Sequence, residues 1–165
     1  MPASDPSAAG PLWAPVVASR QLQLFTLYSS PTFDVLSTGI TQPDGASKLC
    51  LTCHDGAYGA ITSAHTFGDG KPMTLSGSHP VSFRYDTSLT FDPKLHMPGS
   101  LRDPASTASG LTPLGTIATD LLDGSGKMQC SSCHDVHHSG IGTHHLRYDY
   151  ASDGGRTMCR TCHNK

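Results

Sequence analysis

Three short stretches of this 165-residue chain contain all of its cysteines and share one spacing. They are CLTCH (50–54), CSSCH (130–134) and CRTCH (159–163). The CxxCH spacing is typical of covalent haem attachment, because two thiols add across the two vinyl groups of a porphyrin and the adjacent histidine lies under the iron. The sequence therefore predicts three haem c groups. The expected attachment residues are Cys50, Cys53, Cys130, Cys133, Cys159 and Cys162, and the expected proximal ligands are His54, His134 and His163.

Two other uses of paired cysteines fit the sequence less well. A zinc site typically combines two CxxC pairs roughly 15–20 residues apart, whereas 75 and 24 residues separate the motifs here. Redox-active CxxC pairs or a disulfide framework leave the histidine after each second cysteine unexplained.

Histidine is in surplus for the distal face of each iron. Of the ten histidines, seven remain after the proximal ones: His65, His79, His96, His137, His138, His144 and His145. Methionine is the other usual distal donor, but a lone methionine more often fills a gap in a core. We expect bis-histidine ligation at all three irons, and hence low-potential, six-coordinate, low-spin haems without a vacant site for substrate.

Two of these histidines lie in contexts suited to a distal ligand. His137 follows His134 by three residues, on the same side of an expected short helix, so it cannot reach the far face of its own haem. It can reach a neighbouring iron, which would bring two haems edge to edge. His79 precedes a proline, which favours an extended backbone and a ligand delivered from a loop. Either could instead be a surface histidine, the reading we favour for His138.

The third distal ligand is open among the remaining histidines. We expect His145, shortly before the third motif, with His144, His65 and His96 as alternatives.

Few apolar side chains are available to fill an interior. Leu, Ile, Val and Phe make up 30 of the 165 residues, below the roughly 20% under which disorder is common. Disorder also requires a high net charge, whereas the net charge here is −2. We expect a mostly irregular chain with little β structure, in which short α-helices carry the CxxCH motifs around a haem-filled core.

The expected organisation is a single domain over residues 1–165. A Pro- and Ser-rich extended segment, 1–45, precedes a three-haem region, 46–165. The alternating QLQLFTLY (21–28) predicts a strand or a packed extended segment, and TIATDLLD (116–123) predicts a brief helix.

Charge and hydropathy exclude several partners. The 11 Lys and Arg residues are scattered, which disfavours a nucleic-acid or anionic-membrane surface. No stretch reaches the roughly 18 apolar residues of a membrane span, and no signal peptide is visible at the start. Because haem is attached to CxxCH motifs outside the cytoplasmic membrane, we still expect an exported protein.

The order of motifs resembles a known group of cytochromes. SKLCLTCHDG, SHPVSF, CSSCHDVH and MCRTCHNK, over roughly residues 12–165, are similar to bacterial multihaem c-type cytochromes with doubled CxxCH motifs. The similarity is greatest to extracellular tetrahaem cytochromes that form conductive filaments. There the histidines of the (D/S)HP and CHDxH motifs are distal ligands, and these match His79 and His137. Those relatives carry a further CxxCH upstream, so we expect either a three-haem member or a sequence that starts downstream of the natural N-terminus.

The resemblance implies electron transfer rather than enzymatic catalysis. We expect a subunit of an extracellular filament, made of head-to-tail copies of itself, since heterologous contacts that do not close give open filaments. Its other partners would be redox proteins or extracellular acceptors. The alternative is a soluble periplasmic multihaem carrier. A multihaem reductase is disfavoured, because it needs a five-coordinate haem and histidine is in surplus.

Overall fold

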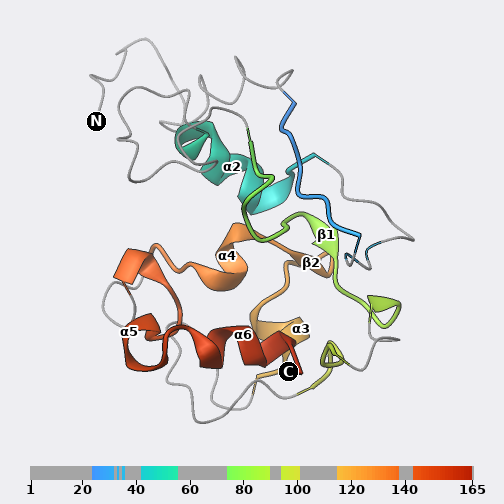
Figure 1. The fold of residues 1–165 in the computed structure, drawn as a ribbon, viewed down its shortest axis with the longest axis vertical. Coiled ribbons are helices and arrows are strands. Elements are labelled where there is room, and N and C mark those ends of the chain that lie inside the picture. The colour runs from blue at the N-terminus through green and yellow to red at the C-terminus, as the bar shows by residue number, and fades with distance from the viewer. Residues whose placement is uncertain are drawn as a thin grey trace. The chain divides into compact units, whose positions relative to one another are not determined.

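The computed structural model describes residues 24–31, 33, 35, 42–55, 74–89, 94–100, 115–137 and 143–164. Over these residues, short helices and one small antiparallel ribbon are joined by irregular backbone (Figure 1). The prediction of short helices with little β structure is confirmed. The predicted haem-filled core stays a prediction.

The described elements are few. The helices are α2 (Gly45–His54), α3 (Ile117–Asp120), α4 (Cys130–Cys133), α5 (Tyr150–Asp153) and α6 (Arg156–Cys162), with a 3₁₀ helix, η3 (Thr143–His145). The strands are β1 (Phe83–Arg84) and β2 (Lys127–Met128).

The chain divides into two compact units, which are described separately below. Unit 1 comprises Met1–Phe33 and Ile40–Ser82, and unit 2 comprises Asp34–Gly39 and Phe83–Lys165. Unit 1 therefore contains the first CxxCH motif, and unit 2 contains the second and third. The single domain expected from the sequence stays a prediction.

An extended segment near the start of unit 1 packs against later parts of that unit. Thr26 forms a parallel bridge with Thr74. The side chain of Gln42 binds both backbone groups of Phe25, accepting its N–H at 2.7 Å and donating to its carbonyl at 3.1 Å. The described part of the predicted extended segment, residues 24–28, is thus extended and held by hydrogen bonds, although Leu24 is exposed.

The ribbon of unit 2 has one apolar face. Phe83 pairs with Met128, and Arg84 pairs with Lys127. Phe83 and Met128 are buried while Arg84 is exposed. A further antiparallel bridge joins Leu122 to Met128, so the ribbon continues into the turn after α3.

Helix α3 begins at a capping box, which accounts for the helix predicted over residues 116–123. Thr116 Oγ1 accepts the N–H of Thr119 at 3.1 Å, and the N–H of Thr116 donates to Thr119 Oγ1 at 2.9 Å. Ile117 anchors the helix with no exposed surface. The helix is shorter than predicted, because it ends at Asp120 and the chain then turns toward the ribbon.

The described core is small and contains many polar groups. Its buried apolar residues are Val35, Leu51, Leu75, Phe83, Tyr85, Leu89, Ile117, Leu121, Met128 and Tyr148. Its buried polar residues are Ser47, Thr52, Asp55, Ser82, Gln129, Ser132, Asp135 and Thr161. Several of these polar residues lie in or beside a CxxCH motif, which shows that the chain uses its buried hydrogen bonds to fix the motifs.

Candidate functional site

Each CxxCH motif lies at the C-terminal end of a helix. Helices α2, α4 and α6 carry the first, second and third motifs. All six cysteines lie in the described residues, and each has a thiol rather than a disulfide. Cysteines three residues apart lie on one side of a helix, so each pair presents two thiols to the same partner. The predicted helical placement of the motifs is confirmed.

The residue before the second cysteine is a buried hydroxyl residue in all three motifs. These residues are Thr52, Ser132 and Thr161. Thr52 Oγ1 donates to the carbonyl of Leu49 at 2.6 Å. Thr161 Oγ1 donates to the carbonyl of residue 157 at 2.9 Å. Ser132 Oγ instead accepts the N–H of residue 129 at 2.9 Å. In each case the hydroxyl forms a hydrogen bond with the backbone of its own helix or of the residue that caps it.

The second motif is held by a short antiparallel bridge centred on Leu146. Leu146 pairs with His134. The N–H of Asp135 donates to the carbonyl of His145 at 2.7 Å, and the N–H of Arg147 donates to the carbonyl of Cys133 at 2.9 Å. The backbone on both sides of His134, the predicted proximal ligand, is therefore fixed.

The third motif is held in the same way by Leu95. Leu95 pairs with His163. The N–H of Asn164 donates to the carbonyl of Lys94 at 2.7 Å, and the N–H of His96 donates to the carbonyl of Cys162 at 2.8 Å. Position by position, these bonds match those around Leu146. Unit 2 therefore contains two copies of one arrangement, which we call the leucine bridge.

Side chains add to the bridge at the second motif. Arg147 donates from Nη1 to Asp135 Oδ2 at 3.2 Å, and from Nε to the carbonyl of Ser131 at 2.9 Å. Both members of the ion pair are largely buried, with exposures of 14% and 7%. Asp135 Oδ1 also accepts the N–H of His137 at 3.1 Å. One guanidinium thus ties the middle of α4 to the residue after the proximal histidine.

Two predicted ligands have a ring nitrogen within hydrogen-bonding distance of a backbone carbonyl. His134 Nδ1 lies 2.9 Å from the carbonyl oxygen of His144, and His79 Nδ1 lies 2.9 Å from the carbonyl oxygen of Pro80. Because a carbonyl only accepts hydrogen bonds, each Nδ1 carries the hydrogen. Nε2 is then the unprotonated nitrogen, which is the form that binds a metal. The sequence predicted His134 as a proximal ligand and His79 as a distal one, and both present Nε2 in this way.

The structure corrects the helical argument made for His137. Helix α4 ends at Cys133, and His134 has an extended backbone with φ −111° and ψ 134°. His137 follows in a turn closed by the side chain of Asp135, so it does not share a helical face with His134. The leucine bridge is the physical reason, because it draws His134 into an antiparallel pair. His137 is exposed, and its role as a distal ligand stays a prediction.

The candidates for the third distal ligand have different surroundings. His144 and His145 are exposed and both have positive φ, 59° and 58°. This uncommon backbone directs their carbonyls to the second motif, at His134 and Asp135. His96 lies in the bridge of the third motif. His65, like His138, lies outside the described residues. The choice of His145 stays a prediction.

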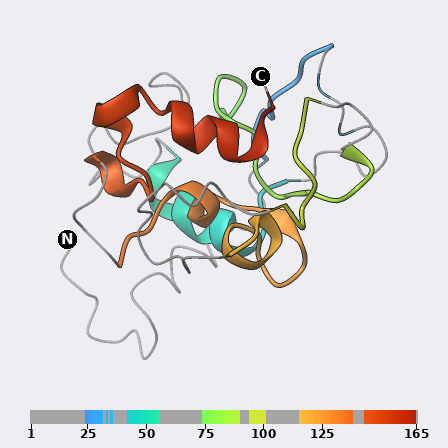
Figure 2. The same ribbon diagram turned by 90° about the horizontal axis from the view of Figure 1, so that it is seen from below.

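The attachment thiols of the second and third motifs lie close enough to influence one another. Burial, together with the nearby Cys130 and Cys159 thiols, raises the pKa of the Cys133 thiol to about 11. Burial also raises the pKa of the Cys162 thiol to about 12, with a contribution from Cys133. Helices α4 and α6, which carry these two motifs, both belong to unit 2 (Figure 2). Unit 2 therefore contains two cysteine pairs whose thiols influence one another.

The sequence analysis did not find the leucine bridges or the Arg147–Asp135 pair. A signal for the bridges was present, since Leu95 and Leu146 are each flanked by basic residues, in KLH and HLR. The recurring hydroxyl before the second cysteine was also visible in the three motifs. Neither pattern has a known meaning without the pairing that the structure shows.

Comparisons with known proteins assign neither a family nor a function to this chain. No family model matches the chain, and no curated protein is similar to it. Among the described residues, no three His, Cys, Asp or Glu side chains gather into a group that could hold a bare metal ion. In the same part of the chain, no helix is both long and apolar enough to cross a membrane.

Proposed function

We propose that this chain is an electron-transfer protein that binds three c-type haems covalently. The observation that carries the proposal is the repetition of the complete CxxCH motif, with no cysteine left over, on three short helices. The second and third motifs both belong to unit 2, so porphyrins attached to them would share one compact unit, as electron hopping between haems favours.

The residues present fit the cofactor. Six thiols are available to form thioethers. Three histidines follow them directly, and His134 presents Nε2 because its Nδ1 donates to a backbone carbonyl. When bound, haem supplies a one-electron iron couple whose potential depends on axial ligands, hydrogen bonds and burial.

The protein's own contribution is to position the histidines that would bind the irons. The leucine bridges hold the backbone at His134 and His163. The hydrogen bond to His134 Nδ1 fixes the ring's tautomer and direction and increases its basicity as a ligand. Neither role needs a proton to move, and we propose no catalytic residue.

We further propose, from the resemblance to filament-forming cytochromes, an exported and extracellular protein that assembles with copies of itself. Distal ligation by His79 and His137, and by His145 or one of its alternatives, is part of this proposal. A monomeric periplasmic carrier is the alternative. Sedimentation of the purified haem protein separates the two, since the filament gives large assemblies and the carrier gives monomers.

The test of the central proposal is a mass and a spectrum. The purified protein, expressed with the haem-attachment machinery of an exporting bacterium, should have the mass of the chain plus three haems and a Soret band. Replacing both Cys130 and Cys133 by alanine should remove one haem and leave two. Replacing Ser125 by alanine, at an exposed turn, is the matched control and should leave three. A colourless protein with the mass of the bare chain refutes the proposal.

A further inference from the structure

The third motif differs from the others in exposure and charge. Cys159 is the one exposed cysteine of the six, whereas the other five are partly buried. Helix α6 also contains Arg156 and Arg160, both exposed. Residues three and four apart share a helix face, so Arg156, Cys159 and Arg160 form one stripe that continues toward His163.

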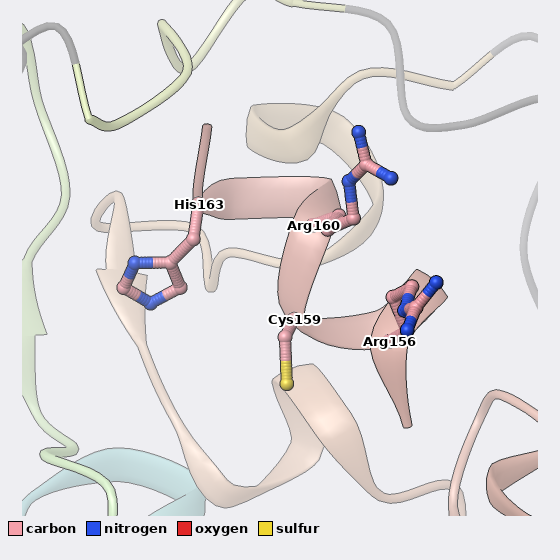
Figure 3. Close-up of a pocket in the computed structure, with 4 residues that line it drawn as sticks. All are labelled: Arg156, Cys159, Arg160 and His163. Carbon is pink, nitrogen blue, oxygen red and sulfur yellow. The ribbon is translucent and has the colours of Figure 1, made fainter. Parts of the chain in front are cut away.

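These four residues line a cavity of about 490 Å³. Its volume is in the range of small-molecule sites, roughly 300–1,000 Å³. Figure 3 shows the imidazole of His163 on one side of Cys159 and the two guanidinium groups on the other. The Cys159 thiol would attach a porphyrin and the His163 imidazole would bind its iron. The guanidinium groups of Arg156 and Arg160 form the rim beside this attachment point.

The two guanidinium groups make this rim positively charged. Within the described residues, neither Arg156 nor Arg160 forms an ion pair. The carboxylate nearest in sequence, Asp153, accepts a hydrogen bond from the backbone N–H of Thr157 at 2.8 Å and so stabilises the first turn of α6. The chain as a whole has the opposite sign, with a net charge of −2.

We infer that the arginine rim of the third motif, Arg156 and Arg160, is the site where small, multiply charged anionic redox complexes exchange electrons with the protein. The inference rests on the proposed function, because it requires a haem at Cys159 and Cys162. A haem held at Cys159 and Cys162 would supply the one-electron couple, the charge of the anionic complex would change by one unit, and no bond would form or break. The guanidinium groups raise the local concentration of the anion beside the exposed attachment point.

The sign of the salt dependence distinguishes this rim from the protein's overall charge. A net negative protein repels an anion, so its reaction with ferricyanide would speed up as salt is added. Attraction by a local cationic rim gives the reverse, because salt screens it over about 10 Å at 0.1 M. The inference predicts that stopped-flow oxidation of the fully reduced haem protein by ferricyanide slows as ionic strength rises. Oxidation by cobalt(III) hexaammine should speed up.

The test variant is Arg156→Gln with Arg160→Gln. Two unit charges acting on a trivalent anion at about 10 Å predict a threefold to tenfold loss of the ferricyanide rate at about 0.1 M ionic strength. The matched control is Arg84→Gln with Lys127→Gln, a cross-strand pair of cations in the same unit. This control also removes two positive charges, but from the β1–β2 ribbon instead of α6. It should change the ferricyanide rate less than twofold. Both variants should keep three haems, since none of the replaced residues belongs to a CxxCH motif.

Two results overturn the inference. One is a ferricyanide rate that rises with ionic strength in the natural protein. The other is an equal loss in the test and control variants, which would show that net charge alone steers the reaction. Both results leave the proposed function intact, since the protein would still hold haem and accept electrons. A chain without a Soret band would instead defeat the proposed function.

Discussion

Replacing Arg147 by glutamine tests whether the ion pair at the second motif holds the proximal histidine. Arg147 lies 3.2 Å from Asp135, and the two side chains are 14% and 7% exposed. Removing one member of a fully buried pair costs about 3–5 kcal/mol, whereas an exposed pair contributes about 1 kcal/mol or less. In the variant, Asp135 would still accept a hydrogen bond from the N–H of His137. The expected loss of unfolding free energy is therefore about 2–3 kcal/mol, between these limits.

The loss should be visible in both stability and redox behaviour. For a unit in the 60–100-residue range, such a loss lowers the melting temperature on the order of 10 °C. It should also raise the reduction potential of one haem, because a loosened bridge weakens the hydrogen bond from His134 Nδ1 and makes the ligand less basic. Urea titration followed by the Soret band measures the first effect, and spectroelectrochemical titration measures the second.

A double-mutant cycle with Asp135→Asn isolates the pair from other effects of the substitution. The two changes together should cost less than the sum of the single changes, because neither leaves a buried charge alone. Arg84→Gln, at an exposed strand position, is the matched control and should change stability by about 0.5 kcal/mol or less. If Arg147→Gln behaves like this control and leaves all haem potentials unchanged, the pair does not hold the motif.

Further predictions concern single residues. His79→Ala should convert one haem from low-spin to high-spin, seen as a high-spin ferric band and carbon monoxide binding after reduction; unchanged spectra would exclude His79 as a ligand. Tyr85→Phe removes a hydroxyl that donates to the His96 carbonyl at 2.6 Å and should cost about 1 kcal/mol in urea unfolding. Thr116→Ala removes the cap of α3 and should also cost about 1 kcal/mol; no loss would refute the cap. In the haem-free chain, the pKa of the Cys133 thiol is raised to about 11, so this thiol is neutral at pH 7. Its alkylation, followed by peptide mass, should therefore accelerate as pH rises toward 11, and a rate that is flat with pH would contradict this.

The sequence was sufficient for features that depend on local chemistry. The three motif helices follow from CxxC spacing, which needs both thiols on one side of a turn. Helix α3 follows from a threonine cap before an apolar residue that becomes fully buried. Each of these requires only neighbours within a few positions.

Features that depend on distant pairing could not be predicted. The end of α4 at Cys133 is set by Leu146, thirteen residues beyond it, and nothing in CSSCHDVH signals that partner. The extended backbone of His134 follows from the same bridge, so the helical placement of His137 was wrong. The unusual backbone at His144 and His145 likewise accompanies hydrogen bonds that their carbonyls accept from the distant second motif.

The two leucine bridges show that a physical requirement, rather than the order of segments, determines the arrangement. Leu146 follows the motif that it holds, whereas Leu95 precedes its motif by more than sixty residues. A simple tandem repeat would keep the same order at both motifs, yet the hydrogen bonds match and the order is reversed. In both cases a helix stops at the second cysteine, and the carbonyl of that cysteine and the N–H two residues later are paired across the bridge. Those backbone groups flank the proximal histidine, so pairing them fixes that residue with only three residues of partner strand. A chain with a small apolar core can therefore position its histidines by short backbone pairings, without an extended sheet or long helices.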